Sequence, residues 1–171
     1  MIAHQTGVPE GTVILHDRNL LNAGLRSEGQ RGRGKSVVTY RDAANLLIAV
    51  AGSRSVKDSA NTVKDYAELV ASEPLVFGGA ERGHTFGDAL AALLEAAPAD
   101  RSVFAGREWG TIDVWLFGPA PTAKIEWELG SSHGRIDYHG SREHREFADL
   151  QFIAKFTQVT LGHVGELVED A

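Results

Sequence analysis

The sequence predicts an α+β fold in which helices come first, an antiparallel sheet follows and a short helix closes the chain. Two observations support this class. Apolar residues recur with a period of about 3.6 over the first half of the chain, which is typical of amphipathic helices. Beyond Pro98 the period changes to two, which is typical of antiparallel strands with one solvated face. This change divides the chain into a helical region, residues 1–98, and a sheet region, residues 99–171, which would serve self-association or partner binding.

The helices of the first region are recognised by an apolar stripe and by the residues that bound them. They are expected at residues 10–23, 41–51, 56–71 and 86–97. Pro9 opens the first of these near its first turn and Gly24 closes it. Gly52 and Pro98 are expected to end the second and the fourth. The glycine-rich and proline-rich stretch at residues 73–85 is expected to be a loop.

The strands of the second region are short and are separated by turn residues. They are expected at residues 111–117, 123–129, 135–139 and 150–159, with turns at GPAPT (118–122) and SSHG (131–134) and a closing helix at 160–170. The second strand alternates, with Ile125, Trp127 and Leu129 on one face and Lys124, Glu126 and Glu128 on the other. The last strand would place Leu150, Phe152, Ala154 and Phe156 on one face.

The composition limits the class of protein. With 171 residues and 43% hydrophobic content, the chain can form one compact domain or two small ones that share an interface. It has no cysteine, which excludes disulfides and thiolate metal sites and fits a reducing compartment. No apolar run is long enough to span a membrane, and the first residues lack the plan of a signal peptide. We therefore expect a soluble, cytoplasmic protein.

The net charge of −6 is unevenly distributed along the chain. Residues 1–55 hold seven lysines and arginines against four acidic residues, whereas residues 56–171 hold ten against nineteen. A basic head on an acidic body suggests an anionic partner for the head, although a difference of this size also arises by chance.

The stretch GQRGRGKS, residues 29–36, matches the phosphate-loop pattern G-x-x-x-x-G-K-[ST]. A true phosphate loop follows a buried strand and leads into a helix whose positive end faces the ligand. Here a helical pattern leads in and the β-prone run SVVTY leads out, and no apolar strand that ends in Asp is evident to hold a magnesium ion. This inverted order argues against an NTPase.

The same stretch fits a basic β-hairpin over residues 25–40. Leu25 and Arg26 would begin it, glycines would form the tip because they tolerate positive φ, and residues 37–40 would return. The cations that alternate along it are Arg31, Arg33 and Lys35. Such a hairpin suits a phosphate backbone or a narrow minor groove.

The residues before the hairpin, IAHQTGVPEGTVILHDRNLLNAGL (2–25), resemble the helix-turn-helix of winged-helix DNA-binding proteins. The matching positions are a small residue in the first helix, a glycine at the turn, apolar residues between the helices and the exit: Ala3, Gly7, Val8, Thr12, Val13, Leu20, Ala23, Gly24 and Leu25. The resemblance implies that residues 10–23 form a recognition helix and that the hairpin is the wing. More loosely, the order of this motif, the GRG wing and the helix RDAANLLIAVAGS (41–53) is similar to small regulators encoded by phages and prophages.

By this resemblance, DNA contacts come from the outward face of the recognition helix and from the wing. They are Thr12, Leu15, Arg18, Asn19 and Asn22 on the helix, and Arg26, Arg31, Arg33, Lys35 and Ser36 in the wing region. Arg and Asn suit guanine and adenine edges, Thr12 suits a phosphate and Leu15 suits a thymine methyl group. The alternative is a solvated helix face. His16 is expected to pack or to lie at the surface rather than to read a base.

The expected function is therefore sequence-specific binding of double-stranded DNA by a transcriptional regulator. A homodimer is expected because half-sites usually occur in pairs. Ile14 and Leu15, however, are apolar on a face that would meet water. They and the acidic second half favour an alternative, a phage-type protein-binding inhibitor such as an anti-defence protein, with the winged helix as its scaffold.

Other patterns are weighed and set aside. A possible metal cluster is formed by His133, His139, His144, Asp137, Glu143 and Glu146, but no HxxxH or HExxH spacing supports it, so a polar hairpin and loop are expected. The tryptophans at 109, 115 and 127 lie in or beside the sheet, where packing in a core or interface is expected rather than stacking on single-stranded bases, because acidic residues surround them. No nucleophile-and-base pattern is evident, so neither an enzyme nor a cofactor is expected.

Overall fold

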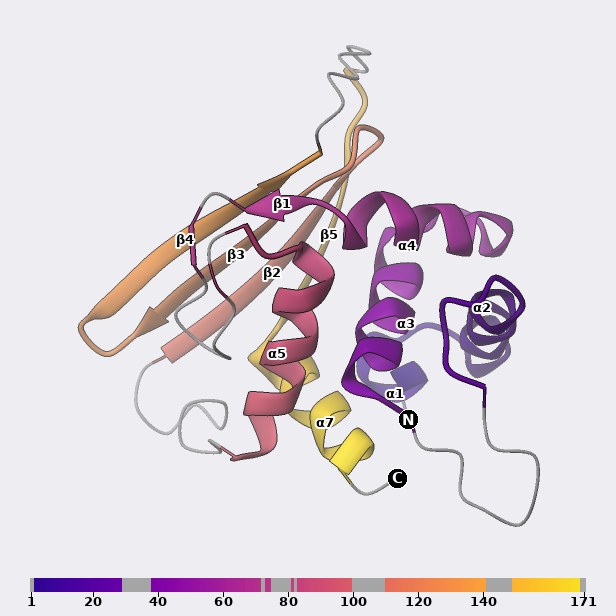
Figure 1. Ribbon diagram of the computed structural model, residues 1–171, viewed down its shortest axis with the longest axis horizontal. Coiled ribbons are helices and arrows are strands. Elements are labelled where there is room, and N and C mark those ends of the chain that lie inside the picture. The colour runs from indigo at the N-terminus through magenta and orange to yellow at the C-terminus, as the bar shows by residue number, and fades with distance from the viewer. Residues whose placement is uncertain are drawn as a thin grey trace.

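The computed structural model describes residues 2–28, 38–71, 73–74, 81, 83–99, 110–140 and 149–169, with the backbone alone at residues 97–99 and 129. Within these residues the fold is α+β, as the sequence predicts. Helices form the N-terminal part, a five-stranded antiparallel sheet follows, and a helix closes the chain (Figure 1).

The helices and strands follow one another in nearly the predicted order. The helices are α1 (Ile2–Thr6), α2 (Glu10–Asn22), α3 (Tyr40–Gly52), the 3-10 helix η1 (Val56–Asp58), α4 (Ser59–Ala67), α5 (Phe86–Ala99) and α7 (Gln158–Glu169). The strands are β1 (Val70–Ala71), β2 (Gly110–Gly118), β3 (Thr122–Leu129), β4 (Ser132–His139) and β5 (Phe152–Thr157). In the sheet the strands lie in the order β1-β4-β3-β2-β5.

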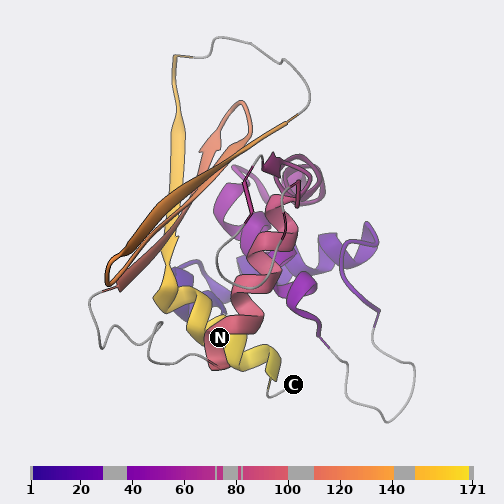
Figure 2. The ribbon, with the colours of Figure 1, turned by 60° about the vertical axis from the view of Figure 1, so that its left-hand side comes forward.

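The sheet has one face toward the helices and one face away from them, and the described helices all lie on the same side (Figure 2). The period of two in the sequence explains this division. On β3, Ile125 is buried and Lys124 and Glu126 point the other way, as predicted. The register aligns Val114, Ile125 and Ile136 across three strands, so apolar side chains form a continuous layer beneath the helices.

Residues from both sides of the predicted division at residues 98 and 99 contribute to one core. The helical part supplies fully buried leucines and isoleucines such as Leu47, and the sheet supplies side chains such as Leu116. Burial of each such side chain contributes about 1.5–3 kcal/mol to folding. The Tyr66 hydroxyl donates a hydrogen bond of 2.7 Å to the carbonyl of Phe117, which joins α4 directly to β2.

A glycine creates the space for the largest side chain on the inner face of the sheet. Gly134 on β4 is paired with Trp127 on β3, and a Cβ atom at Gly134 would lie 2.3 Å from the indole ring. The ring therefore lies directly over the glycine backbone, and any side chain at position 134 would displace it.

The helix predicted over residues 56–71 is wrong in its last four residues. The segment begins as η1, continues as α4 and ends at Ala67. Val70 and Ala71 form β1, which pairs with His139 and Tyr138 at the edge of the sheet. Apolar periodicity alone does not separate a short buried strand from the end of a helix, and here pairing with a distant strand decides the conformation.

Several predicted boundaries shift by a few residues. Helix α5 continues to Ala99 instead of stopping before Pro98, because a proline near the end of a helix removes few backbone hydrogen bonds. The turn before β4 lies at residues 130–131 rather than 131–134, since Gly130 supplies the positive φ of +59°.

The last strand is shorter than predicted, because α7 begins at Gln158 rather than at residue 160. The side-chain oxygen of Gln158 accepts the N–H of Ile112 at 3.0 Å, which ends the ladder between β2 and β5. Leu150 precedes β5 and is 76% exposed, so it does not share the inner face with Phe152 and Phe156. Among the described helices, none combines the length and the apolarity that crossing a membrane requires.

Candidate nucleic-acid interface

The first two helices are joined by a tight turn at the glycine that the sequence analysis identifies. Gly7 has φ of +69°, a conformation that side chains rarely adopt, and Pro9 precedes the first residue of α2. Ala3 lies in α1, as expected. Gly7 and Pro9 therefore set the turn between the two helices in the local sequence.

Helix α2 ends in a glycine-based cap. Gly24 has φ of +68°, and its N–H binds the carbonyl of Leu21 at 3.1 Å. The N–H of Leu25 binds the carbonyl of Leu20 at 2.9 Å. These two bonds form a Schellman motif, which satisfies carbonyls that the helix end leaves free and turns the chain away from the helix axis.

The inner face of α2 is held by packing and by a polar network. Val13, His16 and Leu20 are buried against the rest of the helical layer. The hydroxyl of Ser59 donates to the carbonyl of Val56, so its oxygen is the acceptor for His16 Nδ1, 2.8 Å away. Burial lowers the pKa of His16, which keeps the ring neutral at pH 7. His16 is therefore a packed residue, one of the two positions expected for it.

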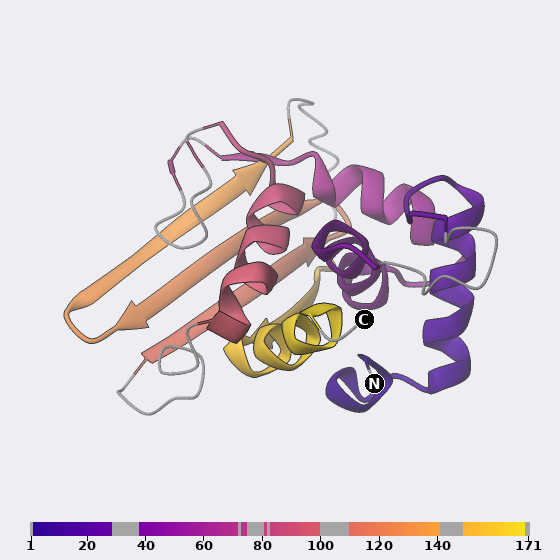
Figure 3. The same ribbon diagram turned by 60° about the horizontal axis from the view of Figure 1, so that its bottom comes forward.

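The outward face of α2 is open to solvent among the described residues. Leu15 is 48% exposed, Arg18 and Asn22 are exposed, and Thr12 is half-buried. Arg18 forms no hydrogen bond or ion pair within the part of the chain that the structure describes. The helix lies at the side of the molecule farthest from the sheet (Figures 1 and 3).

Two of the predicted contact residues are already engaged within the protein. Asn19 donates its side-chain N–H to the carbonyl of Val56 at 2.8 Å, so it helps to hold α2 on η1. Arg26 lies against α2, with its Nε 2.6 Å from Asp17 Oδ1, and this ion pair offsets its charge. Both residues contribute to the position of α2.

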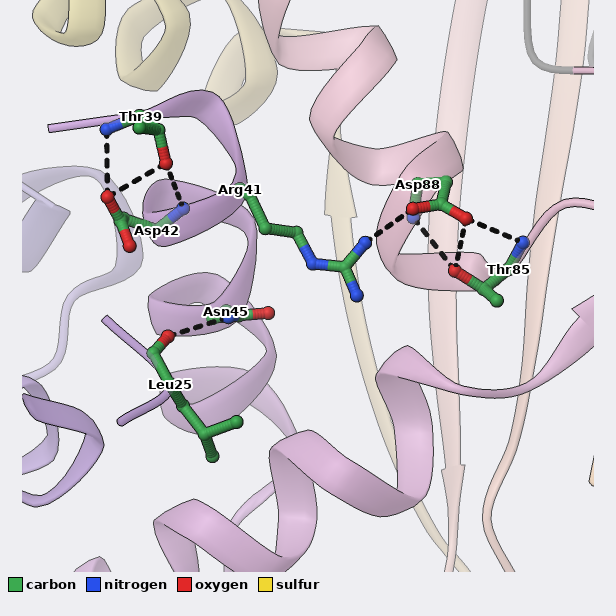
Figure 4. A network of polar contacts seen from close by, with 7 residues as sticks. All are labelled: Leu25, Thr39, Arg41, Asp42, Asn45, Thr85 and Asp88. Carbon is green, nitrogen blue, oxygen red and sulfur yellow. Dashed lines mark hydrogen bonds and ion pairs between the residues drawn. The ribbon is translucent and has the colours of Figure 1, made fainter. Parts of the chain in front are cut away.

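A single carboxylate connects the two ends of the segment that carries the basic residues. Asp42 Oδ1 accepts the N–H of Ser27 at 2.7 Å, and Asp42 Oδ2 accepts the N–H of Thr39 at 2.9 Å and the Thr39 hydroxyl at 2.8 Å. Nearby, Asn45 donates to the carbonyl of Leu25 at 2.7 Å (Figure 4). Helix α3 thus fixes the backbone at Ser27 and at Thr39, on either side of residues 29–37.

The local electrostatics keep Asp42 ionised. Burial of the carboxyl group acts to raise its pKa, but the N–H groups of Thr39 and Ser27 and the Thr39 hydroxyl outweigh burial, so the pKa is lowered below 3.8. The N–H of Asp42 in turn binds the Thr39 hydroxyl at 3.1 Å. This reciprocal pair is a capping box, and it starts α3.

The strands predicted on either side of the basic segment are wrong where the structure describes them. Leu25 and Arg26 belong to no strand, Thr39 is the N-cap of α3, and Tyr40 is its first residue. Thr39 is extended, as an N-cap residue usually is, but the capping box satisfies N–H groups at the helix start, so a helix follows it instead of a strand. The wing residues Arg31, Arg33, Lys35 and Ser36 lie outside the described residues, as does Val37.

The base of this segment and α2 share one groove of about 300 Å³. Its polar residues are Asp17, Arg26 and Asp42. Its apolar residues come from four helices and from a position two residues before α3: Ile2, Val13, Ile14, Val38, Ala43, Leu46, Val164, Leu167 and Val168. The described residues on either side of residues 29–37 therefore lie next to the exposed helix.

Sequence reasoning did not identify the Asp42 network, although the sequence holds a signal for it. The pattern [ST]-x-x-[DE] occurs at Thr39–Asp42 and again at Thr85–Asp88. In the second box the Thr85 hydroxyl donates to Asp88 at 2.7 Å, and Arg41 bridges the two helices through a 2.6 Å ion pair with Asp88 (Figure 4). The pattern locates both helix starts, but it does not show that Asp42 also binds Ser27.

The other groups weighed in the sequence are separated by the fold. His133 and His139 lie at opposite ends of β4, and His144, Glu143 and Glu146 are outside the described residues. Trp127 points toward the helices, Trp115 points to the opposite face of the sheet, and Trp109 is outside the described residues. Trp115 therefore belongs to a surface rather than to the core.

Comparisons of this chain with protein-family models, with curated proteins and with solved structures give no match. Its function is accordingly inferred from the arrangement of its own side chains.

Proposed function

We propose that this chain is a sequence-specific regulator that binds double-stranded DNA in the cytoplasm as a homodimer. Helix α2 enters the major groove, and the basic segment at residues 29–37 contacts the phosphate backbone or the minor groove. One observation carries the proposal: Asp42 ties both ends of the basic segment to the protein beside a helix whose outer face is open.

The roles of individual residues follow from their exposure and partners. Arg18 and Asn22 are exposed on α2 and have the side chains best suited to base edges. Leu15 contacts a thymine methyl group and Thr12 a phosphate. Asn19 and Arg26 hold α2 in position, because each is bound to another part of the chain. The remaining charge that attracts DNA comes from Arg31, Arg33 and Lys35.

Duplex selection from a random pool, followed by affinity measurements over a range of salt concentrations, tests this proposal. With about five phosphate contacts, the logarithm of the affinity should fall with the logarithm of the salt concentration with a slope of about −4 to −5. Arg31→Ala, Arg33→Ala and Lys35→Ala together should reduce the slope by about 3, because each contact contributes about 0.9.

Base reading is tested separately with Arg18→Ala and Asn22→Ala. Each should weaken binding to the selected duplex by about 1–3 kcal/mol and relax the sequence preference at one position. Lys64→Ala is the matched control, because Lys64 is an exposed cation on α4. Specificity that survives both changes on α2 would remove the assignment of the recognition helix.

A second candidate function is favoured by one observation. Ile14 is 50% exposed next to Leu15, and Ile14 also lines the apolar groove. These side chains suit a protein partner, so α2 would then bind a target while the acidic second half engages it or imitates nucleic acid. The two functions differ in one measurement, since a protein-binding inhibitor has no duplex affinity at any salt concentration.

A further inference from the structure

The face of the sheet that points away from the helices, here called the outer face, is covered by none of the described helices (Figure 2). Its residues alternate with the buried ones on four strands: Thr111, Asp113, Trp115 and Phe117; Thr122, Lys124, Glu126 and Glu128; His133, Arg135, Asp137 and His139; Ile153, Lys155 and Thr157. It is therefore a broad surface that the described chain leaves without a packing partner.

Two aromatic rings lie at the centre of the outer face. Trp115 and Phe117 are stacked, with ring centroids 6.2 Å apart and planes 5° apart. The ammonium groups of Lys124 and Lys155 lie 4.8 and 4.7 Å from the centroid of the Trp115 ring. The lysines lie over the indole from the neighbouring strands, and Ile153 is 54% exposed at the edge.

Three cations of the outer face are each paired with a carboxylate, and a fourth carboxylate, Glu128, leaves a charge of −1 among these residues. Lys124 lies 2.9 Å from Glu126, Arg135 lies 2.7 Å from Asp137, and Lys155 lies 2.7 Å from Asp113. Each of these three cations thus has its own carboxylate, whereas the whole chain carries a charge of −6. Between two copies of an acidic protein, electrostatic repulsion is smallest where such a nearly neutral surface forms the contact.

We propose that two copies of this chain associate through their outer faces about a two-fold axis. The axis runs across the strands at the level between Lys124 and Glu126. A two-fold rotation about it places each strand over the same strand of the second copy, in the reverse direction. Lys124 then faces Glu126 of the second copy, and Arg135 faces its Asp137. The same rotation brings Asp113 over the ring of Trp115, between the two lysines that cover it.

The order of charges along the strands is what makes this contact self-complementary. On both β3 and β4 a cation and an anion follow each other two residues apart on the same face. Reversal of the strand therefore exchanges the two signs, which is the condition for an isologous interface. Sheets that pack face to face keep their strands nearly aligned, so the pairs stay within reach of one another.

The size of the surface sets the expected strength. Four strands that each expose about 20 Å of length cover about 400 Å² on each copy, or about 800 Å² in all, which is below the range of stable interfaces and typical of weak ones. We therefore expect a dimer that dissociates in the micromolar range. Helix α2 lies on the far side of the molecule and remains uncovered in this dimer (Figure 3). The inference does not depend on DNA binding.

The test is a charge exchange followed by sedimentation equilibrium. In a dimer of the Lys124→Glu variant, a carboxylate at position 124 faces the carboxylate of Glu126 at both symmetric contacts. In a dimer of the Glu126→Lys variant, two ammonium groups face each other at the same two contacts. Each variant should dimerise about tenfold more weakly than the unmodified chain. An equimolar mixture of the two variants restores opposite charges at both contacts, so its dimerisation should recover. Circular dichroism confirms that both variants are folded.

Lys64→Glu and Glu68→Lys are the matched controls, because they make the same changes of net charge at exposed positions in and after α4. They should dimerise as the unmodified chain does. The proposal is wrong if the unmodified chain is a monomer at about 300 µM. It is also wrong if the mixture dimerises no better than its components. Single-stranded DNA that quenches the tryptophan fluorescence of a monomeric unmodified chain, but not that of Trp115→Phe, would assign the outer face to nucleic acid instead.

Discussion

The substitution Asp42→Ala removes the carboxylate that holds both ends of the basic segment. Three hydrogen bonds to a charged acceptor are lost, from the Ser27 N–H, the Thr39 N–H and the Thr39 hydroxyl. Bonds of this kind contribute about 1.5–3 kcal/mol each. Ser27 and Thr39 are exposed residues, so water replaces part of this interaction. We expect the free energy of unfolding to fall by about 3 kcal/mol.

Asp88→Ala is the matched control for this change. Asp88 forms the same capping box with Thr85, but its side chain is 53% exposed and it connects no second segment of backbone N–H groups. Loss of a cap of this kind costs about 1 kcal/mol, and loss of the exposed ion pair with Arg41 adds about 0.2–1 kcal/mol. Urea unfolding followed by circular dichroism at about pH 7 gives both values, and hydrogen exchange at the Ser27 and Thr39 amides reports on the clamp itself.

The pH dependence gives an independent check on the sign of the effect. The pKa of Asp42 is lowered in the folded protein, so the unfolded chain takes up the proton first as the pH falls. The stabilisation is therefore fully present above pH 3.8 and is lost as the pH falls through the folded pKa. The gap between the unmodified chain and Asp42→Ala should close in acid. A cost no larger than that of Asp88→Ala, or a gap that persists at low pH, would refute this reasoning.

Two further predictions concern buried residues. His16 has a lowered pKa, so the free energy of unfolding should fall as the pH drops below 6.5. The variant His16→Asn keeps a donor to Ser59 and should flatten this pH dependence. The exposed control His133→Asn should leave the pH dependence unchanged. Unfolding measured between about pH 7 and pH 5 checks this, and equal slopes for both variants would contradict it. Gly134→Ala should lower the free energy of unfolding by about 1–3 kcal/mol, because its Cβ would meet the ring of Trp127, and an unchanged urea midpoint would show that the ring moves freely.

The fold class was predictable because the period of the apolar residues changes once along the chain. Helix α2 was placed well, since Pro9 and Gly24 mark both of its ends in the local sequence. Strand β1 was not found, because Val70 and Ala71 become a strand only through pairing with β4. Local sequence signals thus placed α2, whose ends are marked by nearby residues, and missed β1, which depends on pairing with a distant strand.

The candidate site was predictable only in part, for a related reason. The apolar pattern placed Val13 and Leu20 on the inner side of α2, where both are buried, but it left His16 open between a packed and a surface position. It did not show that Asn19 would bind Val56 or that Arg26 would bind Asp17, because both contacts depend on how the chain returns to α2. From Val114 to Phe117 every residue of β2 is apolar or aromatic, so the sequence alone did not decide that Trp115 faces outward.

The helices and the sheet share one hydrophobic core, and this has a practical consequence for mapping any binding activity. A fragment that stops at residue 98 would lack Leu116, so the part of α3 around Gly52 that packs against it would be exposed to water. The Tyr66 hydroxyl would also lose its acceptor, the carbonyl of Phe117. Phe86 would likewise lose the ring of Tyr138, whose centroid lies 5.3 Å away. Such a fragment is expected to aggregate, so a failure to bind in an assay would not show that α2 has no binding activity. Assignments to α2 must come from point changes in the intact polypeptide.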